Sequence, residues 1–204
     1  MIIIIDYGMG NLRSVQKAFE KFCPDVIVSS SSKHVLKADK IVLPGVGAFR
    51  NAMAELDKRG LVDPIKKSIE KGKPFLGVCL GLQLLFSESS EGGSVKGLDI
   101  IKGRVLKFDD KNGLKVPHMG LNLIRNTQYA QRTTILDGVN DSSYMYFVHS
   151  YYVQPEEREV ILCETDYGII FTSGIHRDNI YAFQFHPEKS QAAGLRIIEN
   201  FARS

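Results

Sequence analysis

The sequence predicts an α/β protein: a doubly wound, mostly parallel sheet flanked by helices, with an additional mixed or antiparallel strand region in the second half. Two observations support this fold class. In the first 90 residues, short apolar runs alternate with amphipathic helical patterns, and the runs are apolar throughout, as in strands covered on both faces. After residue 95, strand-like segments follow one another with few helical signals between them. The length suits one domain, residues 1–204.

The elements expected in the first half follow a regular order. Strands are expected at residues 2–5, 25–29, 40–44 and 74–79, and helices at residues 11–22, 48–59 and 63–72. In the first helix, Leu12, Val15 and Phe19 recur at helical spacing. Asn11 stands just before them and is a residue type that caps helix N-termini. The alternation of strand and helix favours parallel strands joined by helical crossovers.

The second half is expected to extend the sheet. Strand-like segments lie at residues 99–108, 117–124, 144–153, 158–165, 168–175 and 180–185. A helical pattern over residues 190–202 closes the chain. With so few helices to cross over, we expect these strands to pair in an antiparallel or mixed way.

Composition and charge exclude several classes of protein. The net charge of +3 is small and the basic residues are scattered, so no nucleic-acid partner is expected. No apolar stretch approaches the roughly 20 residues of a membrane span. The three cysteines, Cys23, Cys79 and Cys163, include no C-x-x-C pair and fit a reducing compartment, so we expect a cytoplasmic protein. The histidines lack the spacing of a metal site such as H-x-x-x-H, and no cofactor is expected.

The stretch GVCLG places Cys79 between Gly77 and Gly81, where an apolar strand meets a helical pattern. A sharp turn from strand to helix pushes the residue at the turn above the sheet edge, and glycines two positions away avoid collisions. The helix beginning near Leu80 also points its positive end at the sulfur, which favours the reactive thiolate. The pattern predicts a nucleophile, although a small buried cysteine in an ordinary loop is the alternative.

A thiolate nucleophile needs a base, and His186 is the best-placed histidine. It ends an apolar strand, and Glu188 stands two residues on, where both side chains project to the same face of an extended backbone. A carboxylate in that place orients the imidazole and stabilises its charged form. His149 is a competing candidate, but no carboxylate stands at matching spacing. A surface turn with an incidental His-Glu pair is the structural alternative.

A glycine-rich loop follows the strand at residues 40–44. Gly45 and Gly47 allow backbone N–H groups to turn toward one point, as an oxyanion site in acyl transfer requires. Such a loop also suits a phosphate, but the chain has no G-x-x-x-x-G-K-[ST] motif, and the stretch at residues 8–13 lacks the third glycine of a dinucleotide fingerprint.

Three stretches together resemble the class I (triad) glutamine amidotransferases: LPGVGAF, GVCLGLQLLF and FQFHPEKS. Within that family the chain is most similar to the glutaminase subunits of imidazole glycerol phosphate synthase, in the stretches DYGMGNLRSV, GLDIIKGRVLKF, PHMGLN and YFVHSYY. The resemblance spans almost the whole chain. It implies a flavodoxin-like fold and a glutaminase that serves histidine biosynthesis.

The resemblance also implies a role for each matched residue. Cys79 attacks the side-chain amide of glutamine, His186 passes protons to the leaving ammonia, and Glu188 orients His186. A γ-glutamyl thioester forms and is hydrolysed to glutamate. The residues implied for the oxyanion site are Val46, Gly47 and Leu80, and those implied for binding glutamine are Gly45, Gly47, Gln83, Ser150 and Tyr151.

The implied partner is a (β/α)8-barrel cyclase subunit, which forms a heterodimer with the glutaminase and uses its ammonia. Leu121, Lys189 and Ser190 fall near the implied interface. Leu121 departs from the subfamily, which usually carries tryptophan there, and this puts details of docking in doubt. Three alternatives stay open: the glutaminase of another synthase, such as those for pyridoxal phosphate or anthranilate, a catalytically silent regulatory subunit, and, more remotely, a cysteine peptidase.

Overall fold

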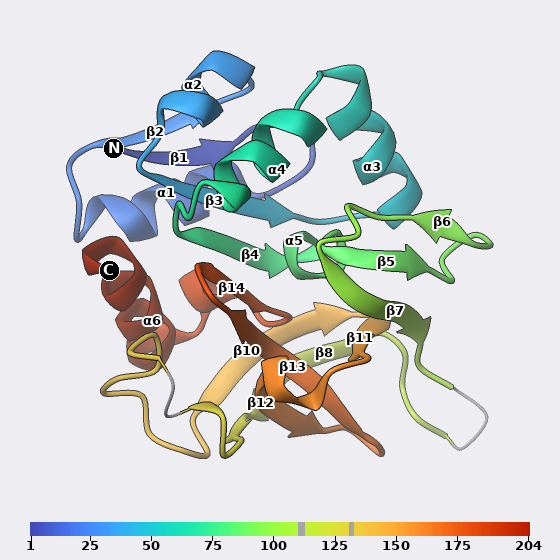
Figure 1. Ribbon diagram of the computed structural model, residues 1–204. Helices are drawn as coiled ribbons and strands as arrows, with labels where there is room; N and C mark the ends of the chain where they lie inside the picture. The colour runs from blue at the N-terminus through green and yellow to red at the C-terminus, as the bar shows by residue number, and fades with distance from the viewer. Residues whose placement is uncertain (110–112, 131–132) are drawn as a thin grey trace.

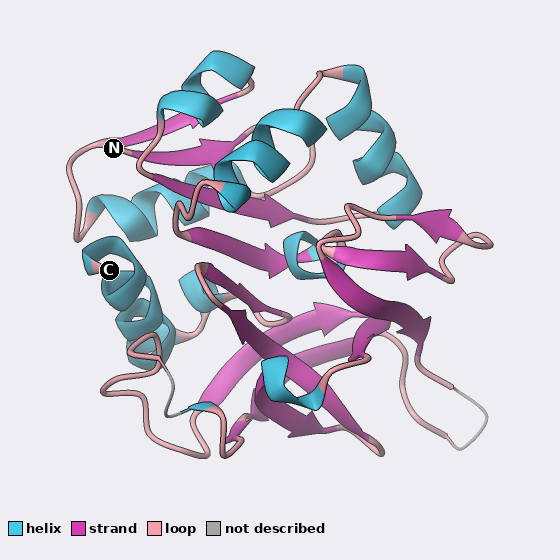
Figure 2. Ribbon diagram, viewed as in Figure 1, coloured by secondary structure: helices cyan, strands magenta, loops and turns pink. Residues whose placement is uncertain are grey.

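A computed structural model describes residues 1–109, 113–130 and 133–204 of the chain. In this part, twelve strands form one sheet and two form a second sheet, with helices on both faces of the larger one (Figure 1, Figure 2). The structure therefore has the α/β class and the mixed second half that the sequence predicts.

The centre of the larger sheet is parallel. Its strands lie in the order β2 (Val26–Ser29), β1 (Ile2–Ile5), β3 (Lys40–Gly45), β4 (Phe75–Cys79) and β14 (Ile180–Phe183). All four isoleucines of β1 are buried, and they face opposite sides: Ile3 and Ile5 join one core cluster, Ile2 and Ile4 the other. A strand covered on both faces explains why this run is apolar throughout.

The helices divide between the two faces. One face carries α1 (Leu12–Glu20) and α6 (Gln191–Arg203), where Phe19 and Phe201 meet edge to face at 6.0 Å between ring centroids. The other face carries α2 (Ser32–Lys37), α3 (Phe49–Lys58) and α4 (Val62–Glu70). The side chain of Asn11 accepts from the Ser14 N–H at 3.4 Å and caps α1, as the sequence predicts. The six-residue helix α2 lies outside the elements expected from the sequence.

The chain after residue 85 extends the larger sheet. The strands that do so are β5 (Phe86–Ser89) and β6 (Val95–Lys96), which lie outside the elements expected from the sequence, and β7 (Ile101–Lys107), β9 (Arg125–Asn126), β11 (Tyr151–Pro155), β12 (Ile161–Asp166) and β13 (Ile170–Arg177). The small sheet pairs β8 (His118–Leu123) with β10 (Tyr144–His149). The described residues also include the short helices α5 (Leu80–Gln83), η2 (Arg158–Val160) and η3 (Pro187–Lys189).

Two strands lie elsewhere than the sequence suggests. The segment 144–153 is not one strand: it divides at Ser150 into β10 and β11, which belong to different sheets. The segment 180–185 contributes β14, which joins the parallel core beside β4 and is antiparallel only to β13. The carboxyl ends of β3, β4 and β14 therefore meet at one edge of the sheet, as Figure 1 shows.

Across residues 1–109, 113–130 and 133–204, no helix combines the length and the apolar character needed to cross a membrane.

Candidate active site

The nucleophile candidate stands at the end of β4, in the middle of this edge. Gly45 pairs in register with Cys79, and Phe183 pairs with Val78. The loop after β3 and the segment after β14 therefore both emerge next to the cysteine. Ligands of open α/β sheets bind at this position, beyond the carboxyl ends of the strands.

The backbone of Cys79 is strained in the way that an elbow requires. Its φ of 55° and ψ of −107° lie outside the regions that residues with a side chain usually adopt. A Cβ at Gly81 would overlap the carbonyl oxygen of Leu43, and one at Gly77 would lie 2.8 Å from the carbonyl oxygen of Gly81. The two glycines thus permit the sharp turn. The following helix α5 has only four residues, so the expected helix-dipole effect on the sulfur is small.

His186 and Glu188 form a buried pair after β14, but not on the extended backbone that the sequence suggests: Glu188 lies in the 3-10 helix η3, which His186 precedes. The Nδ1–H of His186 donates to Oε1 of Glu188 at 2.9 Å. Burial lowers the pKa of His186, but its interactions with Cys79 and Glu188 outweigh this and raise the pKa to about 9. Nε2 of His186 is buried without a hydrogen-bond partner among the described residues, which leaves this atom free to exchange a proton with the sulfur or a substrate.

His149, the competing base candidate, has both ring nitrogens engaged. Its Nδ1–H donates to the carbonyl oxygen of Tyr151 at 2.8 Å, and its Nε2 lies 2.9 Å from Nδ1 of His118. Burial lowers the pKa of His149 to about 3. A neutral imidazole with two fixed partners suits a structural role, and the geometry favours His186 as the base.

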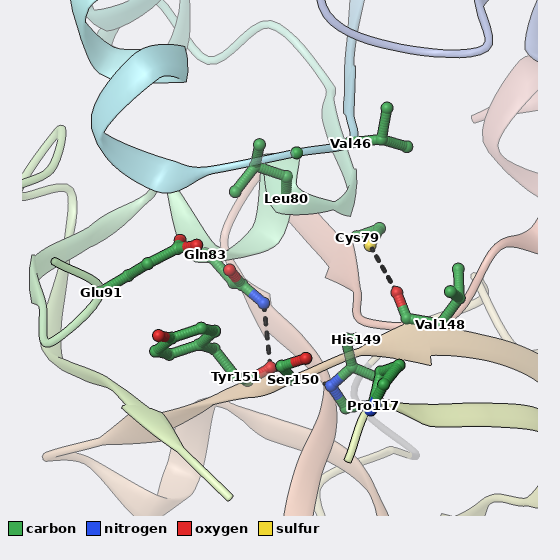
Figure 3. Close-up of a pocket in the computed structure, with 11 residues that line it drawn as sticks. Val46, Cys79, Leu80, Gln83, Glu91, Pro117, Val148, His149, Ser150 and Tyr151 are labelled. Atoms are coloured by element: carbon green, nitrogen blue, oxygen red, sulfur yellow. Dashed lines mark hydrogen bonds between the residues drawn. The ribbon is translucent and has the colours of Figure 1, made fainter.

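A cavity of about 360 Å³ opens beside Cys79 (Figure 3). Its lining includes six residues implied for the oxyanion or for glutamine: Val46, Gly47, Leu80, Gln83, Ser150 and Tyr151. In Figure 3, Gln83 points toward Tyr151, and its amide Nε2 donates to the Tyr151 carbonyl oxygen at 3.0 Å. Gly45 does not line the cavity. A Cβ at that position would overlap the hydroxyl of Tyr7.

The glycine loop has the shape that an oxyanion site can use. Gly47 has a φ of +96°, a conformation that favours glycine, and Val46 is partly exposed at the cavity. Leu80 follows the nucleophile directly, at the start of α5. These residues come from two different loops and meet on one side of the sulfur, as Figure 3 shows for Val46 and Leu80.

Sequence reasoning missed two residues of the site. Glu91 lines the cavity, and its Oε2 accepts from the backbone N–H of Phe49 at 2.7 Å. No pattern marks it, because it lies in a loop between two short strands. Gln184 is buried and places its Nε2 3.7 Å from the sulfur of Cys79. Gln184 is a polar residue inside the apolar stretch YAFQF, and this exception to an apolar run was a usable signal.

The residues implied for a partner interface differ in their exposure to solvent. Leu121 is 55% exposed, and Met119 and Tyr144 are exposed large apolar residues on the same small sheet. Lys189 is exposed, with its Nζ 5.5 Å from the ring centroid of Tyr146. The side chain of Ser190 is buried instead, because its hydroxyl accepts from the backbone N–H of Tyr146 at 2.9 Å and donates to the carbonyl oxygen of His186 at 2.6 Å.

A cysteine on a strand-to-helix elbow, next to a buried His-Glu pair and a small cavity, is the arrangement of an acyl-transfer enzyme that uses a thiolate. The family described as glutamine amidotransferase class-I matches residues 3–204, and the chain belongs to this family. A solved glutamine amidotransferase structure has the same fold, with a TM-score of 0.76, 16% identity and full coverage of both chains.

More similar relatives carry a particular name. The imidazole glycerol phosphate synthase subunit HisH of Syntrophotalea carbinolica is 53% identical, over 98% of each chain. The protein of the same name from Aquifex aeolicus is 52% identical, over 98% of this chain and 95% of its own. The similarity extends over nearly the whole length of these relatives.

Proposed function

We propose that this protein is the glutaminase subunit of an imidazole glycerol phosphate synthase. It hydrolyses glutamine to glutamate and ammonia, and it passes the ammonia to a cyclase subunit that makes imidazole glycerol phosphate and an aminoimidazole carboxamide ribotide in histidine biosynthesis. The observation that carries the proposal is the identity of about half of all positions with relatives of that name, over nearly full length. In this proposal residues 1–204 act as one glutaminase domain in the cytoplasm.

The proposed chemistry divides into two steps at Cys79. The thiol proton moves to His186, and the thiolate attacks the side-chain carbonyl carbon of glutamine. The imidazolium gives the proton to the departing nitrogen, so ammonia leaves and a γ-glutamyl thioester remains. In the second step His186 takes a proton from water, which attacks the thioester and releases glutamate and the thiol. Glu188 keeps Nδ1 of His186 protonated and stabilises the imidazolium in both steps.

The developing oxyanion needs donors close to the carbonyl oxygen. We assign this role to backbone N–H groups of Val46, Gly47 and Leu80, which line the cavity beside the sulfur from the loop after β3 and the start of α5. Removal of one such donor in acyl-transfer enzymes costs about 10²- to 10³-fold in turnover. The positive φ of Gly47 lets this loop present its peptide groups to the cavity.

The rest of the cavity suits the amino-acid end of glutamine. Ser150 and Tyr151 offer main-chain groups at the break between β10 and β11, and Gln83 offers its side-chain carbonyl oxygen, since its NH₂ group already donates to Tyr151 and Gln184. A carboxylate is needed to bind the α-ammonium group, and Glu91 supplies one at the cavity wall. The same contacts then hold the amino-acid end of glutamine and of the γ-glutamyl thioester, while the bond at the other end of the side chain changes.

We place the cyclase contact on the small sheet. Met119, Leu121 and Tyr144 give it an exposed apolar face, and Lys189 lies exposed near Tyr146. A (β/α)8-barrel partner that covers this face would form the heterodimer and receive ammonia close to where Cys79 releases it. Large apolar side chains gathered on one exposed face are typical of a protein interface.

The test is to separate glutamine use from ammonia use in the complex with the cyclase. The Cys79→Ser complex should lose glutamine-dependent synthesis and keep ammonia-dependent synthesis nearly intact, because the two reactions take place on different chains. Cys23→Ser, at a half-buried thiol, is the matched control and should keep both activities. Loss of both activities with Cys79→Ser, in a complex that still assembles, would contradict this division. Synthesis only with a different ammonia-using enzyme would reassign the partner.

A further inference from the structure

Gln184 is a buried amide in contact with the nucleophile. It follows the last residue of β14, between Phe183 and Phe185, and its side chain is inaccessible to solvent. Its Nε2–H donates to the sulfur of Cys79 at 3.7 Å, within the range of a hydrogen bond to sulfur. Burying an amide among aromatic rings costs free energy unless its hydrogen bonds are made. The contact with the sulfur satisfies one N–H group of Gln184.

The orientation of this amide is fixed by its neighbours. The carbonyl oxygen of Tyr151 can only accept, so Gln83 must present its NH₂ group to it at 3.0 Å. The second N–H of Gln83 donates to Oε1 of Gln184, also at 3.0 Å. Gln184 must then turn its own NH₂ group toward Cys79. The opposite orientation would set two NH₂ groups against each other.

The Tyr151 carbonyl oxygen, where this series of hydrogen bonds begins, is itself held in place. The Tyr151 carbonyl also accepts from Nδ1–H of His149 at 2.8 Å. Nε2 of His149 must therefore accept from His118, whose Nδ1 lies 2.9 Å away. The hydrogen-bond chain runs without a break from His118 to the sulfur, through Tyr151, Gln83 and Gln184. The NH₂ group that faces Cys79 is therefore preorganised.

On the basis of the proposed glutaminase chemistry, we infer that Gln184 is a further catalytic residue, whose amide N–H stabilises the thiolate of Cys79. The carbonyl oxygen of Val148, 4.0 Å from the sulfur, accepts a hydrogen bond from the S–H group and so favours the thiol (Figure 3). Gln184 is the neutral donor that opposes it. When the thiol proton passes to His186, the sulfur gains negative charge and the Gln184 bond strengthens. When the thioester forms, that charge leaves the sulfur and the bond weakens again.

The test is the alkylation of Cys79 by iodoacetamide, followed by mass spectrometry in the isolated chain. Only the thiolate reacts, so the rate reports how much of it is present. The background is Cys23→Ser, which removes the half-buried thiol. Cys163 should stay unmodified, because burial raises the pKa of its thiol to about 12. This measurement needs neither glutamine nor the cyclase, so it stands even if the proposed partner is wrong.

Two variants at Gln184 separate the effect of its N–H group from the effect of its size. Gln184→Met keeps the length of the side chain but has no N–H group, and we expect alkylation about tenfold slower at pH 7, as for the loss of one hydrogen bond to a charged group. Gln184→Glu puts a carboxylate against the sulfur and should be slower still. At pH 10, above the ordinary pKa range of thiols, Gln184→Met should react as fast as the parent chain. Gln154→Leu, at an exposed residue of β11, is the control and should change nothing.

The same variants should lower kcat in the complex with little change in KM for glutamine, since Gln184 contacts the sulfur and does not line the cavity. Equal alkylation rates for the parent chain and Gln184→Met at pH 7 would overturn the inference. So would a rate for Gln184→Met that is lower by the same factor at pH 7 and pH 10, because that result means blocked access to the sulfur.

Discussion

Nδ1 of His186 and Oε1 of Glu188 lie 2.9 Å apart, with only 4% and 2% of the two side chains exposed. Because water is largely excluded, the carboxylate interacts strongly with the imidazole. It fixes the tautomer of the ring and raises its affinity for a proton. The interactions with Cys79 and Glu188 accordingly keep the pKa of His186 raised to about 9 in spite of burial. His186 is therefore a stronger base than a free imidazole.

Glu188→Gln should keep the shape of this pair and remove its charge. We expect kcat of the complex with glutamine to fall at least about hundredfold, because the imidazolium loses its counter-ion and the tautomer is no longer fixed. KM for glutamine should change little, since Glu188 does not line the cavity. Steady-state kinetics at several glutamine concentrations measure both. Glu156→Gln, at an exposed site, is the matched control. A large rise in KM with kcat unchanged would make Glu188 a substrate contact.

Gly81→Ala should destabilise the whole protein, because the new Cβ would overlap the backbone carbonyl oxygen of Leu43. Neither group can move without shifting β3 against α5, and we expect a loss of about 3 kcal/mol or more in the free energy of unfolding. Gly72→Ala is the control: nothing lies within 4 Å of its Cβ, and only its φ of +78° is strained, so about 1 kcal/mol is expected. Urea unfolding measures both. Equal losses would mean that the elbow adapts to a side chain.

Two of the buried histidines, His118 and His149, make the free energy of unfolding depend on pH. Burial lowers the pKa of His118 to about 4 and that of His149 to about 3, from 6.5 in the unfolded chain. As the pH falls below 6.5, His118 and His149 bind protons in the unfolded chain but stay neutral in the folded protein. The stability that neutral histidines provide is therefore complete above pH 6.5 and is lost progressively toward pH 4 and 3.

His118→Phe tests this dependence, since His118 already stacks on Phe147 and Tyr167. The variant should show a shallower loss of unfolding free energy between pH 6.5 and pH 4 than the parent chain. The difference in slope should be below about 1.4 kcal/mol per pH unit, the limit for one proton. Carboxylates contribute equally to both proteins and cancel in the comparison. Parallel pH profiles would show that His118 takes up protons equally in the folded and unfolded states.

The local geometry of the site could be predicted from the sequence. Gly77 and Gly81 around Cys79 indicate the elbow, because only glycine fits where the strand turns so sharply into the helix. The sequence also indicates that His186 and Glu188 meet, but the expected extended backbone is wrong: residues Pro187–Lys189 form the 3-10 helix η3, and the pair forms across its first turn. Such features depend on neighbours within a few positions, and those neighbours are visible in the sequence.

Only the tertiary structure determined which strands are neighbours and which distant residues meet at the site. No local pattern says that β14, 100 or so residues after β4 along the chain, completes the parallel core and brings His186 and Gln184 to Cys79. The break at Ser150, which divides one apolar run between two sheets, follows from strand pairing at long range. The place of Glu91 in the cavity wall and the burial of Ser190 likewise depend on contacts with distant segments. Periodicity reports which face of a segment is buried, but the partner that buries it is selected by packing and hydrogen bonding across the whole chain.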